Sequence, residues 1–226
     1  ELSNFEYDLG VVGLGYVGLP LAVESANSAL KVIGYDVNSD RVNEINNGKS
    51  PIEDISDNEL KKALNVFQAT DDPSLLSKCQ HIVISVPTPL TDYQPDLSYV
   101  ESAAKAVGEN LVSNQVVILE STTYPGTTLE VLVPNLEKFS SLEAGSDFYV
   151  GYSPERIDPG NQEWKFKNTP KVISGIYDDS LEKINSFYKK IIDETVIVQG
   201  TREAEMVKLL ENTYRHVNIA LINELA

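Results

Sequence analysis

The sequence predicts an α/β protein: a Rossmann-type, doubly wound, mostly parallel sheet followed by the start of a long connecting helix. Short apolar runs alternate with longer amphipathic stretches, which is the pattern of βαβ units. A Gly-x-Gly-x-x-Gly motif at residues 13–18 stands between the first apolar run and the first amphipathic stretch. From Thr201 an apolar 3.6-residue period continues to the last residue, which indicates one long helix.

The elements follow in chain order. Residues 9–14 predict the first buried strand, residues 17–28 the first helix and residues 31–36 the second strand. Asn38 is expected to cap a helix that ends at Asn47 and Gly48. Further strands are expected at 66–69, 81–86, 115–120, 148–152, 171–174 and 196–198, and further helices at 97–111, 127–137, 180–192 and from 201 onward. Because no stop signal follows the last helix, we expect the chain to be a fragment.

Composition excludes several classes of function. The 226 residues carry a net charge of −16, which argues against nucleic acid or an anionic membrane surface as the main partner. No apolar run approaches the ~20 residues that a membrane span needs. The only cysteine, Cys79, excludes an internal disulfide and favours a reducing, cytoplasmic compartment. His81 and His216 have no partners at metal-ligand spacing, so no metal site is expected.

Each glycine of the motif has its own task in binding a dinucleotide. Gly13 permits the tight turn, Gly15 lets the backbone approach a pyrophosphate, and Gly18 allows close packing of helix on strand. Tyr16 and Val17 complete the turn, and the helix N-terminus that follows presents free N–H groups to the phosphates. The alternative is a glycine-rich turn without a ligand.

Asp36 strengthens the dinucleotide interpretation. It ends the second strand, 18 residues after Gly18, where a carboxylate can accept hydrogen bonds from the adenosine ribose. Its charge would repel a 2′-phosphate and therefore favours NAD over NADP. Arg41 leaves two alternatives open, because it could accommodate that phosphate or be a solvated helix residue.

Two polar segments follow strands at their carboxyl ends, where ligands collect in doubly wound sheets. Residues 86–89 (VPTP) and 120–128 (ESTTYPGTT) offer hydroxyl and amide groups to a phosphate or sugar. The candidate cofactor ligands among them are Pro87, Thr88, Ser121 and Thr122. Helix capping by Thr127 or Thr128 is the alternative for the second segment.

A third polar segment and the last helix add further candidates. In residues 153–161 (SPERIDPGN), Glu155 could act as an acid/base and Arg156 as an anion ligand, or the segment could be a polar turn. Lys208, Asn212 and Arg215 share one face of the last helix by their spacing. Cys79 begins a strand, so we expect it at the edge of the sheet opposite the ligands and in a structural role, as for both histidines.

Taken together, these segments resemble the NAD-dependent nucleotide-sugar 6-dehydrogenases, the UDP-glucose and UDP-N-acetylhexosamine dehydrogenases. The resemblance covers residues 9–226 and includes residues 13–22 (GLGYVGLPLA) and 211–226 (ENTYRHVNIALINELA) besides the three segments above. The SPERIDPGN and ESTTYPGTT forms, with Pro159 where UDP-glucose enzymes commonly have a glutamate, are more similar to the UDP-N-acetylhexosamine branch. A 3-hydroxyacid or 6-phosphogluconate type dehydrogenase and a non-catalytic NAD-binding module are the alternatives.

The resemblance implies two successive NAD-dependent hydride removals that convert the sugar C6 alcohol to a carboxylate, in the synthesis of capsule polysaccharide precursors. It assigns a water-positioning role to Thr122, acid/base work to Glu155, and the C6 oxygen to Lys208 and Asn212. The implied substrate contacts are Glu155, Arg156, Ile157, Lys208, Asn212 and Arg215.

The resemblance also implies how the chain is organised. Residues 1–200 would form the NAD-binding domain, and residues 201–226 a truncated central helix through which full-length relatives form homodimers. The thiol that carries the thiohemiacetal and thioester of the second oxidation would lie in a GGHC-like segment beyond this chain, together with a nucleotide-binding C-terminal domain. We therefore expect the fragment alone to be inactive.

Overall fold

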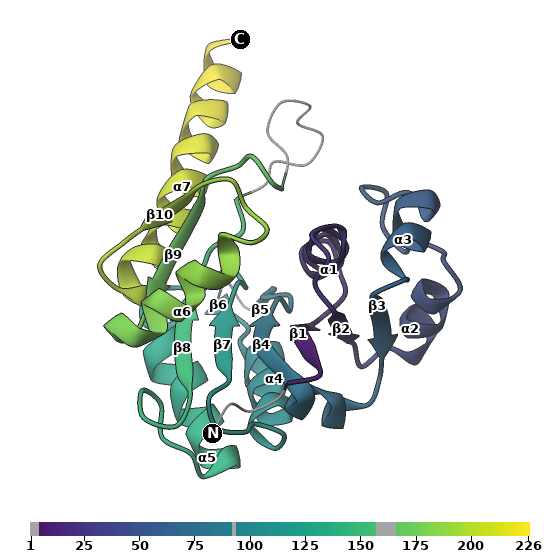
Figure 1. Cartoon of the computed structure of the whole chain (residues 1–226). Helices are drawn as coiled ribbons and strands as arrows, with labels where there is room; N and C mark the ends of the chain where they lie inside the picture. Colours follow the sequence, from purple (N-terminus) through teal and green to yellow (C-terminus); the bar gives the residue numbers. More distant parts are fainter. Residues whose placement is uncertain (1–4, 92–93, 157–165) are drawn as a thin grey trace.

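A computed structural model describes residues 5–91, 94–156 and 166–226 and confirms the α/β class. Eight strands form one sheet with helices on both of its faces (Figure 1). The strands are β1 (Tyr7–Val12), β2 (Val32–Tyr35), β3 (Phe67–Thr70), β4 (Cys79–Ile84), β7 (Val116–Leu119), β8 (Tyr149–Tyr152), β9 (Lys171–Gly175) and β10 (Thr195–Ile197). A separate antiparallel ribbon pairs β5 (Leu90–Thr91) with β6 (Gln94–Pro95).

The sheet has the strand order of a dinucleotide-binding fold. Its order is β10-β9-β8-β7-β4-β1-β2-β3, and the six strands from β3 to β8 are mutually parallel. Numbered along the chain, these six have the order 3-2-1-4-5-6 of the Rossmann fold. β9 pairs antiparallel with β8, and β10 then pairs parallel with β9. The amino end of β9 therefore lies at the same edge of the sheet as the carboxyl ends of β7 and β8.

The central strands are buried on both faces, which explains why they are continuous apolar runs. Every residue of β2 and β7 is buried, as are the last four of β1. One core cluster joins the sheet to α1 (Gly18–Asn27), α2 (Ser39–Asn46), α3 (Asp57–Ala63) and α6 (Asp178–Tyr188). The second joins it to α4 (Ser98–Gly108), the π-helical turn η2 (Thr128–Leu132), α5 (Val133–Ser140) and the start of α7 (Thr201–Leu225).

The differences from the predicted elements are local. As predicted, Asn38 caps α2, because its side chain accepts from the N–H groups of Asp40 and Arg41. The sequence pattern missed α3, although Ser56 and Glu59 form a capping box at its start. It also missed the short 3₁₀ helix η1 (Pro73–Lys78). The helix expected at 127–137 begins with a π turn and continues to Ser140.

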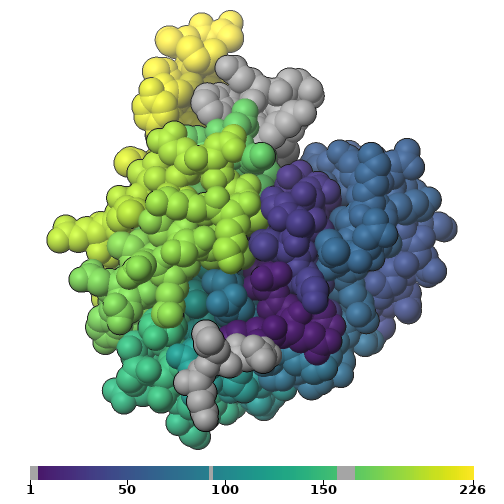
Figure 2. All heavy atoms as spheres, viewed as in Figure 1, coloured from purple at the N-terminus to yellow at the C-terminus, as the bar shows by residue number. Residues whose placement is uncertain are grey.

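Only the first turns of α7 pack against the sheet. Thr201, Ala204 and Glu205 are its buried residues, and the rest of the helix leaves the body of the molecule. Figure 2 shows this end, in yellow, standing clear of the surface. It exposes a series of apolar side chains: Met206, Leu210, Tyr214, Val217, Ile219, Leu221, Ile222 and Leu225. Within the part of the chain that the structure describes, no helix combines the length and hydropathy of a membrane span.

Candidate active site

The glycine motif forms the turn between β1 and α1. Gly13 has φ of +92°, a left-handed conformation that favours glycine. A Cβ on Gly18 would lie 1.8 Å from the Gly13 carbonyl oxygen, so α1 can approach β1 only because this side chain is absent. A Cβ on Gly15 would meet nothing within 4 Å, so Gly15 faces open space above the turn. Gly13 thus permits the turn and Gly18 the close packing of α1, while the pyrophosphate contact of Gly15 stays a prediction.

A cavity of about 560 Å³ opens over this turn. Its volume is in the range of small-molecule and cofactor sites. Of the predicted cofactor residues, it is lined by Gly13, Gly15, Tyr16, Val17, Asp36, Arg41 and Pro87. Val17, the N-cap residue of α1, makes no side-chain capping bond and the first turn holds no acid, so the positive end of the helix dipole is not neutralised by a side chain. An open turn and an uncapped helix N-terminus fit the pyrophosphate of a dinucleotide.

Asp36 lies at the end of this cavity, but its carboxylate is already largely engaged. Oδ2 accepts from the Leu14 N–H at 2.8 Å and from Arg41 Nη1 at 3.0 Å, and Oδ1 accepts from the Asn38 N–H at 2.9 Å. These contacts use three of about four acceptor positions, which leaves one for a ribose hydroxyl. Arg41 lines the same cavity while it pairs with Asp36, and its role toward a 2′-phosphate stays a prediction.

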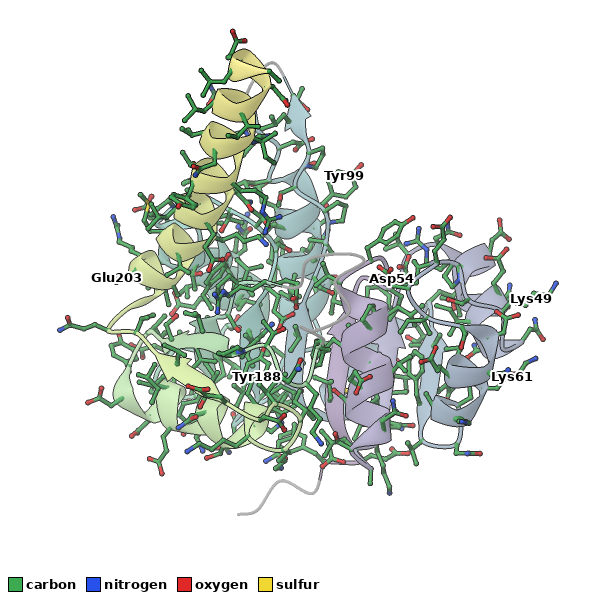
Figure 3. All side chains as sticks on the ribbon, turned by 90° about the horizontal axis from the view of Figure 1, so that it is seen from above. Lys49, Asp54, Lys61, Tyr99, Tyr188 and Glu203 are labelled. Carbon is green, nitrogen blue, oxygen red and sulfur yellow. The ribbon has the colours of Figure 1, made fainter. Side chains whose placement is uncertain are left out.

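One wall of the cavity was missed by the sequence interpretation. Tyr99, Ser102, Ala103 and Ala106 of α4 line it, and Tyr99 projects from the helix (Figure 3). The signal was present, because these four positions follow the i, i+3, i+4, i+7 spacing of one helix face. Small residues on that face leave room for a ligand between α4 and the sheet.

Two glycine substitutions should separate folding from cofactor binding. We expect Gly18→Ala to destabilise the chain strongly, because its Cβ would overlap the Gly13 carbonyl oxygen. Gly15→Ala should leave the free energy of unfolding within about 0.5 kcal/mol of wild type, because the added methyl group meets no protein atom. It should still weaken NAD binding, because the methyl group would occupy the space above the turn where we expect the pyrophosphate. Denaturant unfolding and calorimetric titration measure the two effects. Equal NAD affinity of Gly15→Ala and wild type would contradict this placement of the phosphates.

The VPTP and ESTT segments are joined at the carboxyl edge of the sheet. Thr88 Oγ1 donates to the Thr122 carbonyl oxygen at 2.5 Å, and Ser121 Oγ donates to the Val86 carbonyl oxygen at 2.7 Å. These two hydrogen bonds hold the VPTP and ESTT segments together, and the Thr122 side chain is exposed beside them. Thr88, Ser121 and Thr122 do not line the cavity described above, and their cofactor contacts stay a prediction.

Helix capping, the alternative for the second segment, is not what its threonines do. Thr127 Oγ1 donates to the Tyr124 carbonyl oxygen, and Thr128 Oγ1 donates to Glu205 of α7. The fully buried Glu205 carboxylate also accepts from the N–H groups of Gly126 at 2.5 Å and Thr128 at 2.8 Å. Burial raises the pKa of Glu205, although these hydrogen bonds oppose the shift. Glu205, which sequence reasoning missed, therefore anchors α7 to this segment.

Glu155 and Lys208, two residues with predicted roles at the sugar, come from different elements and interact electrostatically. The Glu155 side chain is 14% exposed, and its charge acts on the half-buried Lys208 ammonium. Burial lowers the pKa of Lys208, although the carboxylates of Glu155 and Glu211 oppose that shift. On its other side Glu155 Oε2 accepts from Lys171 Nζ at 3.2 Å, a residue that sequence reasoning did not single out. Asn212 follows Lys208 by one turn of α7 and is half-buried.

Arg156 is engaged within the protein. Its Nε and Nη2 donate to the Glu211 carboxylate of α7, at 2.9 and 2.6 Å from Oε1, and Nη1 donates to the Pro170 carbonyl oxygen at 2.8 Å. As an anion ligand, Arg156 would have to release Glu211, so its substrate contact stays a prediction. Arg215 lies close enough for its charge to act on Lys208. Ile157 and Pro159 lie outside the described residues.

Cys79 lies at the opposite edge of the sheet, as predicted, and His81 lies two residues further along the same strand. Cys79 is the first residue of β4, pairs with Tyr7 of β1, and is fully buried. Burial raises the pKa of its thiol to about 12. His81 stacks on Phe187 with ring centroids 4.5 Å apart, and burial lowers its pKa to about 4. In residues 5–91, 94–156 and 166–226, no three His, Cys, Asp or Glu side chains gather in a group that could hold a metal ion.

The chain is similar in sequence and in fold to several dehydrogenases of nucleotide sugars. Residues 7–192 match the family model of the UDP-glucose/GDP-mannose dehydrogenase family, NAD-binding domain, and residues 202–226 match its central domain. The chain is 44% identical to the UDP-N-acetyl-D-glucosamine 6-dehydrogenase of Pseudomonas aeruginosa, over 96% of this chain and 52% of that protein. It is 43% identical to Protein CapL of Staphylococcus aureus, over 97% of this chain and 51% of that protein.

A solved structure gives the same result. The UDP-D-ManNAc dehydrogenase of Pyrococcus horikoshii superposes with a TM-score of 0.90 at 39% identity, covering 96% of this chain and 52% of that one. The chain thus spans about half the length of the relatives it matches. Together with the glycine turn and its cavity, these matches decide between the enzyme interpretations: the chain belongs to the UDP-glucose/GDP-mannose dehydrogenase family and carries that family's NAD-binding domain.

Proposed function

We propose that this chain is the NAD-binding half of a UDP-N-acetylhexosamine 6-dehydrogenase, which oxidises the sugar C6 alcohol to a carboxylate in two hydride transfers. One observation carries the proposal: Glu155, three residues past the carboxyl end of β8, acts electrostatically on Lys208 of α7, 53 residues further along the chain, and the dinucleotide cavity opens at the same edge of the sheet. A carboxylate and an ammonium beside a nicotinamide site suit alcohol oxidation. The relatives named for UDP-N-acetyl sugars support the substrate class.

Each residue has a role that its surroundings support. The Lys208 ammonium would hold the C6 oxygen, where negative charge develops as the hydroxyl loses its proton and as each tetrahedral adduct forms. Asn212, one turn further on, would donate to the same oxygen, and Glu155 would accept and return protons. The exposed Thr122 hydroxyl would position the water that hydrolyses the thioester. NAD, when bound, accepts the hydride from C6.

The thiol of the second oxidation does not come from Cys79 in this proposal. Cys79 is fully buried at the amino edge of the sheet, about one strand length, roughly 17–20 Å, from the carboxyl edge. Its raised pKa also keeps it protonated at neutral pH, and the thiolate is the nucleophile. We expect the thiol to lie outside these 226 residues, and the chain alone to make no uronate.

Two further properties belong to the proposal. The exposed apolar side chains of α7 suit a homodimer in which this helix pairs with its copy in a second molecule. A single buried cysteine suits a reducing, cytoplasmic compartment.

A panel of UDP-sugars, assayed by NADH formation with the full-length protein, tests the substrate. We expect a UDP-N-acetylhexosamine to give the highest kcat/KM, and a higher value for UDP-glucose would overturn the assignment.

In parallel, the 226-residue chain is incubated with NAD and the best substrate, and uronate is sought by mass spectrometry. Uronate that still forms in Cys79→Ser would mean that the reaction needs no thiol. Uronate that Cys79→Ser abolishes would mean that Cys79 reaches the sugar. No oxidation of any UDP-sugar would favour the non-catalytic NAD-binding alternative.

A further inference from the structure

Lys171 is a buried cation between two carboxylates. Its side chain is 5% exposed, and Nζ lies 2.9 Å from Glu120 Oε1 and 3.2 Å from Glu155 Oε2. Burying an ammonium group costs free energy unless carboxylates or other acceptors pair with it. Two carboxylates around one ammonium leave a local excess of negative charge. How strongly each carboxylate is stabilised in its ionised form therefore depends on its distance from the Lys171 ammonium.

The antiparallel strand β9 puts this lysine at the candidate site. Lys171 is the first residue of β9, while Glu120 directly follows β7 and Glu155 lies three residues after β8. Had β9 run parallel to β8, its first residue would lie at the opposite edge, beside Cys79. The reversal of one strand thus brings a cation beneath the segment that carries Glu155.

Glu120 is held on the lysine side of this cluster. Tyr188 of α6 donates its hydroxyl to Glu120 Oε1 at 2.5 Å, on the same oxygen that Lys171 contacts, and both side chains are fully buried. Figure 3 shows Tyr188 in the interior, among the side chains packed between α6 and the sheet. Glu120 Oε2 is buried without a hydrogen-bond partner. Glu120 therefore binds the ammonium in the protein interior, while Glu155 is the more exposed of the two carboxylates and its charge also acts on Lys208.

The charge state of the cluster agrees with this arrangement. Burial by itself would lower the pKa of Lys171, but the carboxylates of Glu120 and Glu155 outweigh burial, and the net shift is upward. Lys171 therefore stays charged. Burial raises the pKa of Glu120, and the Lys171 ammonium opposes that shift only in part.

We propose that Lys171 is a positioning residue for Glu155: its buried ammonium, steadied by Glu120 and Tyr188, keeps the Glu155 carboxylate ionised and held toward Lys208. Glu120 then competes with Glu155 for the same ammonium and tunes how strongly Glu155 holds its charge. This inference rests on the proposed function only for the acid/base role of Glu155. The contacts themselves can be tested in the 226-residue chain.

The first test follows the ionisation of Glu155 by NMR in the chain labelled at glutamate Cδ, with Glu155→Gln identifying the resonance. Lys171→Met should move the titration midpoint of Glu155 up by about one to three pH units, the effect of losing an adjacent opposite charge. Lys171→Arg should restore most of the wild-type midpoint. Glu120→Gln should move it the other way, because the ammonium then serves Glu155 alone. Lys189→Met, which removes an exposed lysine after α6, is the matched control and should change nothing.

The outcomes separate positioning from a structural role. An unchanged Glu155 midpoint in both Lys171→Met and Glu120→Gln would overturn the inference, even if both variants were less stable. If Lys171→Met does not fold, the downward shift in Glu120→Gln decides alone. NAD affinity should stay within about twofold of wild type in every variant, because none of the substituted residues lines the cavity.

In the full-length protein, the acidic limb of the kcat profile should move to higher pH in Lys171→Met and return in Lys171→Arg. A shifted Glu155 titration without any UDP-sugar oxidation by wild type would reject the proposed function and keep the positioning role. A kcat profile that does not move, in an active enzyme whose Glu155 titration does, would reject the acid/base role of Glu155 and keep its positioning by Lys171.

Discussion

Replacing Lys208 by alanine in the full-length protein should lower kcat by ~10²–10³ and leave NAD affinity unchanged. The C6 oxygen would lose its contact with the half-buried Lys208 ammonium. Loss of one preorganised donor to a developing oxyanion lowers kcat by about 10²–10³. Lys208 does not line the cavity in which we expect NAD to bind. Steady-state assays with the preferred UDP-sugar give kcat, and calorimetric titration gives the NAD dissociation constant.

The conservative variant sharpens this test. Lys208→Arg keeps the positive charge beside Glu155 but places it on a longer, planar group, so we expect only partial recovery of kcat. Near-wild-type kcat in Lys208→Ala would mean that this lysine only helps to solvate one face of α7.

Glu205→Ala should lower the free energy of unfolding of the chain by about 3–5 kcal/mol. The change leaves the N–H groups of Gly126 and Thr128 and the Thr128 hydroxyl buried without an acceptor, and each unsatisfied group costs about 1–3 kcal/mol. It also releases the start of α7 from the ESTTYPGTT segment. Urea unfolding followed by circular dichroism measures the loss.

Glu203→Ala is the matched control, because Glu203 is exposed on the same turn of α7 and points away from the sheet (Figure 3). Glu203→Ala should change the free energy of unfolding by no more than about 0.5 kcal/mol. A loss of less than 1 kcal/mol in Glu205→Ala would show that the anchor of α7 lies elsewhere.

The sequence predicted most of the elements because local patterns specify them. The apolar runs, the glycine motif and the Asn38 cap each act within a few residues, and β1, β2, α1 and α2 begin and end close to their predicted bounds. The reversal of β9 could not be predicted in this way. It depends on how a strand at the sheet edge pairs with β8, and no local pattern encodes that choice.

The candidate site shows the same limit. The glycines, Asp36, Glu155 and Lys208 are recognisable by residue type, motif and strand position. Their partners are not, because those contacts join distant segments: Arg156 to Glu211 across 55 residues, and Glu205 to Thr128 across 77. Lys171 looked like an ordinary strand residue, and only the fold places it beneath Glu155. The sequence alone does not show which of several lysines or arginines will pair with a given carboxylate, because the fold decides which of them lies within reach.

The most direct test of the whole account is a calorimetric titration of the 226-residue chain with NAD and with NADP. We expect one NAD per chain and weaker binding of NADP, because the Asp36 carboxylate lines the cavity and would repel a 2′-phosphate on the adenosine ribose. Asp36→Asn, which removes the charge and keeps one of the two acceptor oxygens, should narrow the difference in affinity between the two cofactors. Equal affinities for both cofactors in wild type would contradict the role of Asp36, and no binding of either would contradict the cavity as a dinucleotide site.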